Sequence, residues 1–275
     1  MRKKKFSITQ LILTVFMLLL TLTMIVPLLH ILARSLSDPL QSAGMSSLEV
    51  IPRGFSLINY QVLFSNKTLV PSIFNSIFIT VVGTFLNIVL TALAAYVLTR
   101  PGLVGKRVLM VFFIIMMLFD PGIVPEYMTV KKIGLMGSQW SVILCMAVNV
   151  YYLVIMMRYF EDVPVSLCEA AKIDGATSLQ SFFYITLPNV KEMILLNLTT
   201  TLIGAFKVFD EVYIMTAGGP GRSSEVMGTL LYRTGFREDA MGYASAIGAA
   251  IFVITFALSI AQIRMFNMGN EEKEG

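Results

Sequence analysis

The sequence predicts an all-α membrane protein with six transmembrane helices and both termini in the cytoplasm, and three observations carry this prediction. Of the 275 residues, 56% are hydrophobic and only 14% are charged, whereas soluble domains carry about 25% charged residues. Six apolar segments approach or exceed the ~20 helical residues that span a bilayer. Lys and Arg are more frequent in the loops that this topology places in the cytoplasm, above all around the first segment.

The predicted spans are expected to be helical wherever they face lipid, because unpaired backbone groups there would cost several kcal/mol each. Asp120-Pro121-Gly122 is expected to end the third span as a kink near the outer surface. The first span follows the basic run Met1–Lys5 and is longer than the ~7–15 residues of a signal-peptide core, so it is expected to remain as an uncleaved helix. In chain order the spans are expected at residues 8–32, 72–98, 108–124, 141–157, 193–217 and 243–266.

Composition argues against several classes of function. The net charge of +4 is small and the basic residues lie beside apolar spans, so no nucleic-acid surface is expected. His30 is the one histidine, and Cys145 and Cys168 fall in separate segments, so the sequence offers no metal-ligand or catalytic pattern. A membrane-embedded enzyme is therefore disfavoured. A self-sufficient secondary carrier is a weaker alternative, because the two halves show no inverted repeat.

The one sizeable cytoplasmic loop, residues 161–192, has the pattern of a helix–turn–helix unit lying at the membrane surface. Gly175 is expected to stop the first helix in the left-handed conformation of a C-cap. Thr177 and Gln180 match a capping box that starts the second helix. Leu187-Pro188 is expected to end that helix before the fifth span.

In this loop Glu169-Ala170-Ala171, then Gly175, then Ile185-x-Leu187-Pro188 stand in a pattern that resembles the EAA signature of permease subunits of binding-protein-dependent ABC importers. The surrounding form EAAKIDGA resembles the carbohydrate-uptake branch, which includes the maltose importer permeases. The alternative is an interfacial amphipathic hairpin without a partner, which does not need this spacing. The residues that match the signature are Glu169, Ala170, Ala171, Gly175, Ile185, Leu187 and Pro188.

The resemblance implies the type I importer permease fold and a role in transport without catalysis. In that family the signature loop sits in a cleft of a separate cytoplasmic ATPase subunit and transmits ATP-driven closure to the membrane helices. The implied partners are a second permease subunit, two copies of the ATP-binding subunit and an extracytoplasmic sugar-binding protein. ATP and Mg²⁺ would be used by the ATPase subunits, and this chain is expected to bind no cofactor.

The same resemblance leaves two questions open. The implied substrate is a di- or oligosaccharide, with a non-sugar solute as the runner-up. Residues 52–64 resemble the smaller permease of sugar importers, whereas residues 209–216 resemble the larger partner, so either half of a heterodimer is possible.

Polar side chains inside the predicted spans are the candidate substrate pathway, because charges at bilayer depth usually face a bundle interior or a water-filled path. Lys207 and Glu211, at i and i+4, could instead form an ion pair at the periplasmic rim. Asn87 and Asn149 could instead form hydrogen bonds between helices. The candidates are Asn87, Asn149, Asn197, Thr200, Lys207, Asp210, Glu211 and Tyr213.

Basic residues of the outer loops would suit an acidic sugar, although solvated loop charges explain them equally well. They are Arg53, Lys67, Arg222, Arg233 and Arg237.

Overall fold

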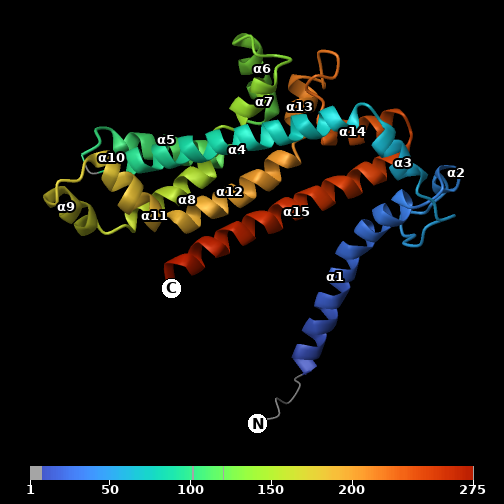
Figure 1. Ribbon diagram of the computed structural model, residues 1–275, viewed down its shortest axis with the longest axis horizontal. Coiled ribbons are helices and arrows are strands. Elements are labelled where there is room, and N and C mark those ends of the chain that lie inside the picture. The colour runs from blue at the N-terminus through green and yellow to red at the C-terminus, as the bar shows by residue number, and fades with distance from the viewer. Residues whose placement is uncertain (1–7, 101, 120, 275) are drawn as a thin grey trace. The chain divides into compact units, whose positions relative to one another are not determined.

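The computed structural model describes residues 8–100, 102–119 and 121–274, so the basic N-terminal run and Asp120 lie outside it. The described residues form helices and no β-strand, apart from one antiparallel bridge between Ser37 and Phe55 (Figure 1). The helices are α1 (Ile8–Ser35), α2 (Pro39–Ser42), α3 (Ile58–Ser65), α4 (Leu69–Thr99), α5 (Lys106–Leu118), α6 (Ile123–Lys132), α7 (Gln139–Cys145), α8 (Val150–Glu161), α9 (Val165–Ile173), α10 (Ser178–Ser181), the π-helix η1 (Phe182–Thr186), α11 (Leu187–Asn189), α12 (Lys191–Phe206), α13 (Asp210–Met215), α14 (Met227–Tyr232), the π-helix η2 (Arg233–Arg237) and α15 (Met241–Glu274).

The chain divides into two compact units. Unit 1 comprises Met1–Val70 and Leu230–Ile254, and unit 2 comprises Pro71–Thr229 and Thr255–Gly275.

Unit 1 contains the long helix α1, whose apolar side chains are exposed along its length. Three threonine hydroxyls of this helix are paired, because each donates to the carbonyl four residues earlier. The hydroxyls of Thr14, Thr21 and Thr23 each lie 2.8 Å from that carbonyl oxygen. Such bonding keeps polar groups satisfied in an apolar helix, which suits a helix surrounded by lipid or by other helices.

Unit 2 is built around a core that joins α4, α8, α12 and η1. Ala95, Leu153, Met156 and Met193 are almost completely buried there, together with Phe182 from η1. In Figure 1, α8 and α12 lie beneath α4, and the hairpin of α9 to α11 lies at one end of these helices. The core therefore connects this hairpin to three long helices of the unit.

Helix lengths support three to five membrane spans. Helices α1, α4 and α15 are each long and apolar enough to cross a bilayer, and the pairs α5 with α6 and α7 with α8 each pass the same test together. Helix α12 has 16 residues, or about 24 Å at 1.5 Å per residue, against a hydrocarbon core of about 30 Å.

The third predicted span, at 108–124, is helical to Leu118 and α6 begins at Ile123, so its helix ends close to the expected kink at residues 120–122, of which Asp120 lies outside the described residues. The next two spans are interrupted where the sequence led us to expect no break. The fourth, at 141–157, is divided into α7 and α8, which are bent by 46°. The fifth, at 193–217, ends as α12 at Phe206 and resumes as the short α13. Hydropathy averages over such breaks, so it cannot show them.

Candidate functional site

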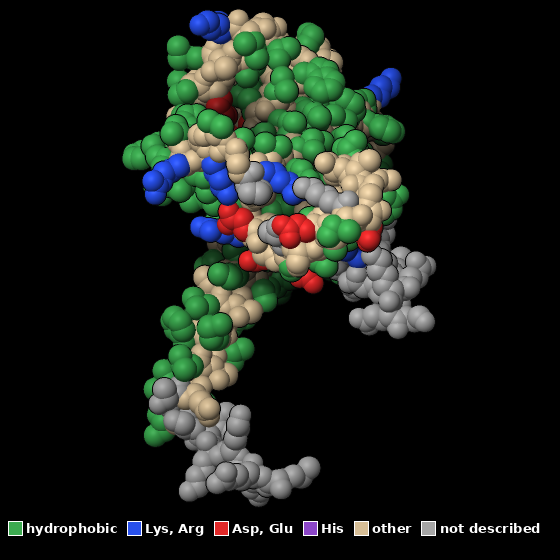
Figure 2. Space-filling view, turned by 90° about the vertical axis from the view of Figure 1, so that its left-hand side faces the viewer, with side chains coloured by type: hydrophobic (Ala, Val, Ile, Leu, Met, Phe, Trp, Pro, Cys, Tyr) green, Lys and Arg blue, Asp and Glu red, His purple; other side chains and the backbone are tan. Residues whose placement is uncertain are grey.

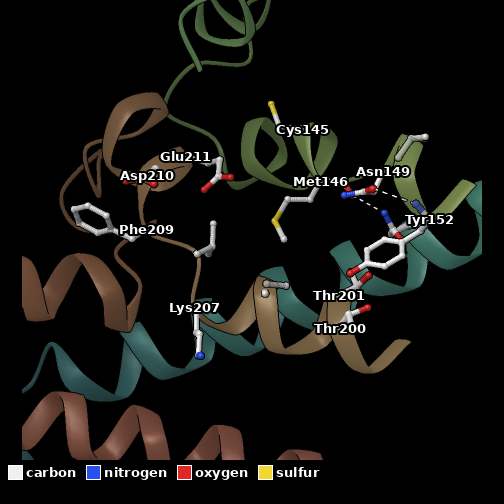
Figure 3. Close-up of a pocket in the computed structure, with 15 residues that line it drawn as sticks. Cys145, Met146, Asn149, Tyr152, Thr200, Thr201, Lys207, Phe209, Asp210 and Glu211 are labelled. Carbon is white, nitrogen blue, oxygen red and sulfur yellow. Dashed lines mark hydrogen bonds between the residues drawn. The ribbon is translucent and has the colours of Figure 1, made fainter. Parts of the chain in front are cut away.

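A cavity of about 440 Å³ lies in unit 2 among α4, α7, α8, α12 and the segment that leads into α13 (Figure 3). Polar side chains from each of these elements reach it. Of the eight candidate pathway residues, those that line it are Asn87, Asn149, Thr200, Lys207, Asp210 and Glu211. The lining also includes Cys145, Tyr152, Thr201 and Phe209.

The break between α7 and α8 is stabilised by two asparagine side chains. Asn149 caps α8, and its Oδ1 accepts hydrogen bonds from the backbone N–H of Tyr151 at 3.0 Å and of Tyr152 at 3.3 Å. Asn87 of α4 donates from Nδ2 to the carbonyl oxygen of Met146, at 2.9 Å, where α7 ends. Backbone groups freed by a broken membrane helix must find such partners. The interhelical hydrogen bond that the sequence left open for Asn87 is therefore present.

The break between α12 and α13 changes the relation of Lys207 to Glu211. Residues 207–209 are not helical, so the two side chains no longer share a helix face. Figure 3 shows Glu211 extending toward the cavity and Lys207 pointing away from it and from Asp210. Among the described residues, none of these three side chains forms an ion pair or hydrogen bond with another. The ion pair between Lys207 and Glu211 that was considered from the sequence is therefore absent from the described residues.

Two candidate residues lie behind the cavity lining. Asn197 is completely buried, and its Oδ1 accepts a hydrogen bond from the Thr201 hydroxyl at 2.9 Å. Tyr213 stacks on Phe209, with ring centroids 5.4 Å apart and planes at 20°. Asn197 and Tyr213 thus support lining residues, and neither reaches the cavity itself.

A polar stripe along α4 was not singled out from the sequence, apart from Asn87. Its members are all buried, and the hydroxyls of Thr80, Thr84 and Thr91 have no hydrogen-bond partner among the described residues. The sequence alone could have revealed this stripe, because its six polar residues are spaced four, four, four, three and four residues apart, which keeps their side chains on one helix face. The stripe consists of Ser72, Ser76, Thr80, Thr84, Asn87 and Thr91.

The helix–turn–helix hairpin of residues 164–189 forms as the sequence predicts at its turn. Gly175 has φ +84°, and the N–H of Ala176 donates to the carbonyl of Ala171 at 2.8 Å, the bond that defines a Schellman motif. The capping box is complete. The Thr177 hydroxyl accepts from the Gln180 N–H at 3.3 Å, and the Gln180 Oε1 accepts from the Thr177 N–H at 2.8 Å. This turn is therefore rigid.

The second arm of the hairpin ends one residue beyond the expected Leu187-Pro188, before α12 begins. It passes through η1 and continues in α11 to Asn189. Pro188 has no N–H to donate, and the helix widens to a π-turn directly before it. The Asn189 Nδ2 donates to the carbonyl of Ile185 at 2.7 Å. Leu187 packs against the core of unit 2, whereas the neighbouring Pro188 is exposed.

The hairpin presents an exposed surface of both polar and apolar side chains. Glu169 and Ala170 are exposed, whereas Ala171 is buried. Large apolar side chains also face outward, with Ile173 86% and Tyr184 81% exposed. Figure 2, which views the end that bears the hairpin, shows Lys, Arg, Asp and Glu side chains gathered in a band there. Exposed apolar groups rimmed by charges mark a surface that contacts a partner or the membrane.

The sequence profile of the family described as "Binding-protein-dependent transport system inner membrane component" matches residues 76–265. The chain belongs to this family. As a member it is an inner-membrane transport component, and its apolar helices agree with that location. The match covers the polar stripe of α4 from Ser76 onward, the cavity and the hairpin, so the two sites described above lie inside the family's shared region.

Two curated relatives come from Bacillus subtilis (strain 168). The probable ABC transporter permease protein YurN is 48% identical over 122 residues, which are 44% of this chain and 42% of that protein. The polygalacturonan/rhamnogalacturonan transport system permease protein YtcP is 38% identical over 173 residues, which are 63% of this chain and 60% of that protein. The segments that match this chain thus make up about half of the length of these two relatives.

One solved structure, of a bacterial ABC transporter involved in the import of the acidic polysaccharide alginate, has a similar fold. The TM-score is 0.78 with 20% sequence identity, over 97% of this chain and 99% of that chain. At this identity the similarity establishes the fold shared with a chain of an ABC importer, and nothing about the substrate.

Proposed function

We propose that this chain is a permease subunit of a binding-protein-dependent ABC importer and forms half of the transmembrane pathway for a sugar. The observation that carries the proposal is the rigid hairpin of residues 164–189, packed on the helices that line a polar cavity, in a member of this family. The relative named for polygalacturonan and rhamnogalacturonan transport supports a di- or oligosaccharide as the substrate.

The proposed topology has six spans with both termini in the cytoplasm. The described helices supply three to five candidate spans, and we assign α12 with α13 as a further, interrupted span. Together α12 and α13 cover Lys191–Met215, which is long enough to cross a bilayer although α12 alone is short. Under this assignment the hairpin lies in the cytoplasm, directly before the interrupted span.

The proposed coupling site is the exposed surface of the hairpin, which would dock on a separate ATPase subunit. Exposed Ala170 permits close approach, and Glu169, which has no side-chain partner among the described residues, is available for a basic group of that subunit. Buried Phe182 connects the hairpin to the core of unit 2. ATP and Mg²⁺ would be used by two copies of the ATPase subunit, and this chain would bind neither.

The proposed pathway is the cavity between the two broken helices. Substrate sites of membrane transporters are often formed where helices are interrupted, because the break supplies polar groups at membrane depth. Here Asn87 and Asn149 hold one break, and Lys207 begins the other. A second permease subunit would complete the pathway, and an extracytoplasmic binding protein would deliver the sugar.

Reconstitution in proteoliposomes tests the proposal. The chain is purified together with a second permease and an ATPase subunit from its own organism, and uptake of a panel of oligosaccharides is measured with the binding protein. We expect uptake that requires ATP and all subunits. Uptake by this chain alone, driven by an ion gradient, would instead establish a secondary carrier. ATP-dependent uptake of a non-sugar solute in place of sugars would refute the sugar assignment.

A further inference from the structure

The charged groups of the cavity are predominantly acidic. Asp210 and Glu211 line it, and neither carboxylate has an ion-pair or hydrogen-bond partner among the described residues. Lys207 is the cation among the described lining residues, and its side chain points away from both carboxylates in Figure 3. A ligand in the cavity therefore meets a negative potential from this chain, and charges interact more strongly in such a partly enclosed site than in bulk water.

Three uncharged lining side chains, those of Thr200, Thr201 and Asn87, present hydrogen-bond acceptors. The Thr200 hydroxyl donates to the carbonyl of Leu196 at 2.8 Å, and the Thr201 hydroxyl donates to Asn197 Oδ1 at 2.9 Å. These hydroxyl protons are thus engaged, and the hydroxyl oxygens remain able to accept. Asn87 uses Nδ2 to bind Met146, while its Oδ1 has no partner among the described residues although the side chain is 1% exposed.

A buried acceptor without a donor costs free energy, so Asn87 Oδ1 favours a ligand rich in donors, and the two threonine hydroxyl oxygens can accept from the same ligand. Sugar hydroxyls are such donors, and carboxylates accept especially strong hydrogen bonds from them. The aromatic rings of Tyr152 and Phe209 also line the cavity and offer apolar faces for a sugar ring.

Three of the basic residues in the predicted outer loops have interactions of their own. Arg53 is paired with Glu49, and Arg233 is paired with Glu238. Arg222, which belongs to the same unit as the cavity, is not among its lining residues and has an interaction of its own.

We propose that the cavity selects neutral oligosaccharides and that Asp210 and Glu211 exclude sugars that carry carboxylates. A uronic acid differs from its neutral parent in having a carboxylate where the parent has a hydroxymethyl group. The exchange removes one donor and adds a negative charge, and both changes are unfavourable beside these acceptors. This inference rests on the proposed function, and it separates this chain both from the alginate importer, whose described substrate is acidic, and from YtcP, which is named for transport of the uronic-acid polymer polygalacturonan.

Equilibrium binding to the assembled complex in nanodiscs tests the inference, with the binding protein left out so that only the membrane cavity selects. The probes are trigalacturonate, trimannuronate and the two neutral trisaccharides obtained by reducing their carboxyl groups. A broader panel of neutral trisaccharides accompanies them. We expect the neutral member of a pair to bind at least about tenfold more tightly at pH 7, the ratio that ~1.4 kcal/mol of repulsion would produce.

Charge-neutralising variants assign this selectivity to the two carboxylates. Glu211→Gln and Asp210→Asn are each expected to lower the neutral-to-acidic ratio at least about threefold, mainly by improving binding of the acidic probe. The control is Asp162→Asn, an exposed carboxylate at the other end of α8 from the cavity. It is expected to leave the ratio unchanged.

The outcomes separate this inference from the proposed function. Equal or tighter binding of the acidic probes, or a ratio that neither variant changes, would overturn the selectivity while leaving a sugar permease intact. If no trisaccharide of either kind binds the complex, the cavity is no sugar pathway and both proposals fail.

Discussion

The ring of Tyr96 meets the ring of Phe182 edge to face, with centroids 4.6 Å apart and planes at 68°. Tyr96 lies near the end of α4, where the Arg100 guanidinium lies 3.9 Å over its ring, and Phe160 of α8 contacts the same ring at 6.0 Å. Phe182 begins η1 in the hairpin. One aromatic cluster therefore joins the proposed coupling site to α4, which also carries Asn87 into the cavity.

Replacing Phe182 by an aliphatic side chain should reduce the coupling of ATP hydrolysis to transport more than it reduces assembly of the complex. Phe182→Leu keeps an apolar side chain but removes an aromatic contact worth about 0.5–1.5 kcal/mol. We expect the complex to assemble and hydrolyse ATP, with fewer sugar molecules transported per ATP. The measurement is the ratio of uptake to ATP hydrolysis in proteoliposomes. Phe112→Leu, at an exposed position on α5, is the control, and an unchanged ratio in Phe182→Leu would contradict the role of the pair.

The turn of the hairpin should depend on backbone conformation and not on side-chain size at Gly175. Its φ is +84°, and a Cβ built there meets no atom within 4 Å. Gly175→Asn should be tolerated because Asn adopts the left-handed region, whereas Gly175→Val should cost about 1–2 kcal/mol and distort the turn. Co-purification of the ATPase subunit should survive in the Asn variant and fall in the Val variant. Equal recovery in the two would show that the turn is unimportant.

The cap at Asn149 should stabilise the break between α7 and α8. Asn149→Ala removes the acceptor for the N–H groups of Tyr151 and Tyr152 and is expected to cost about 1 kcal/mol. Asn149→Ser, which can still cap, should lose only part of this. Thermal unfolding of the purified complex measures the difference. A melting temperature that is the same in all three proteins would mean that the cap contributes nothing.

The outer segment 46–53 should loosen in acid. Arg53 Nε donates to the Glu49 carboxylate at 2.7 Å and the Ser46 N–H donates at 3.0 Å, and these bonds, led by that from Arg53, hold the pKa of Glu49 below its ordinary value of 4.5. A carboxyl with a lowered pKa stabilises the fold above its ordinary pKa, and the contribution is lost as the pH falls through the lowered value.

Hydrogen exchange, corrected for the intrinsic effect of pH, should therefore show this segment protected at pH 7 and progressively less protected as the pH falls below the ordinary value of 4.5. Glu49→Gln should show the lower protection already at pH 7. If the variant is as well protected as the wild type at pH 7, the ion pair does not order the segment.

Local features of this chain could be predicted from the sequence, and features that depend on breaks or tertiary contacts could not. Gly175 and the Thr177–Gln180 capping box act within a few residues, so their geometry follows from residue type. The ends of α7 and α12 follow from partners elsewhere in the fold, such as Asn87 for the Met146 carbonyl. An assumed continuous helix wrongly placed Lys207 beside Glu211.

The candidate pathway was predicted from polarity at membrane depth, which cannot tell a lining residue from one that supports it. Asn197 and Tyr213 satisfy the same criterion as Glu211, yet they bind Thr201 and Phe209 behind the lining. Tyr152 was missed because an aromatic residue in a span carries no signal of its own. The stripe of α4 was accessible to a search for polar residues that share one helix face.

The most direct test of the account is site-specific photo-crosslinking from position 170 of the hairpin in the assembled complex. Ala170 is exposed and belongs to the surface that is proposed to dock on the ATPase. A photoreactive residue there should form an adduct with the ATPase subunit, whereas one at exposed Phe55 should not. An adduct at 170 only with the binding protein or lipid, or accessibility of 170 to impermeant reagents from outside the cell, would contradict the coupling role.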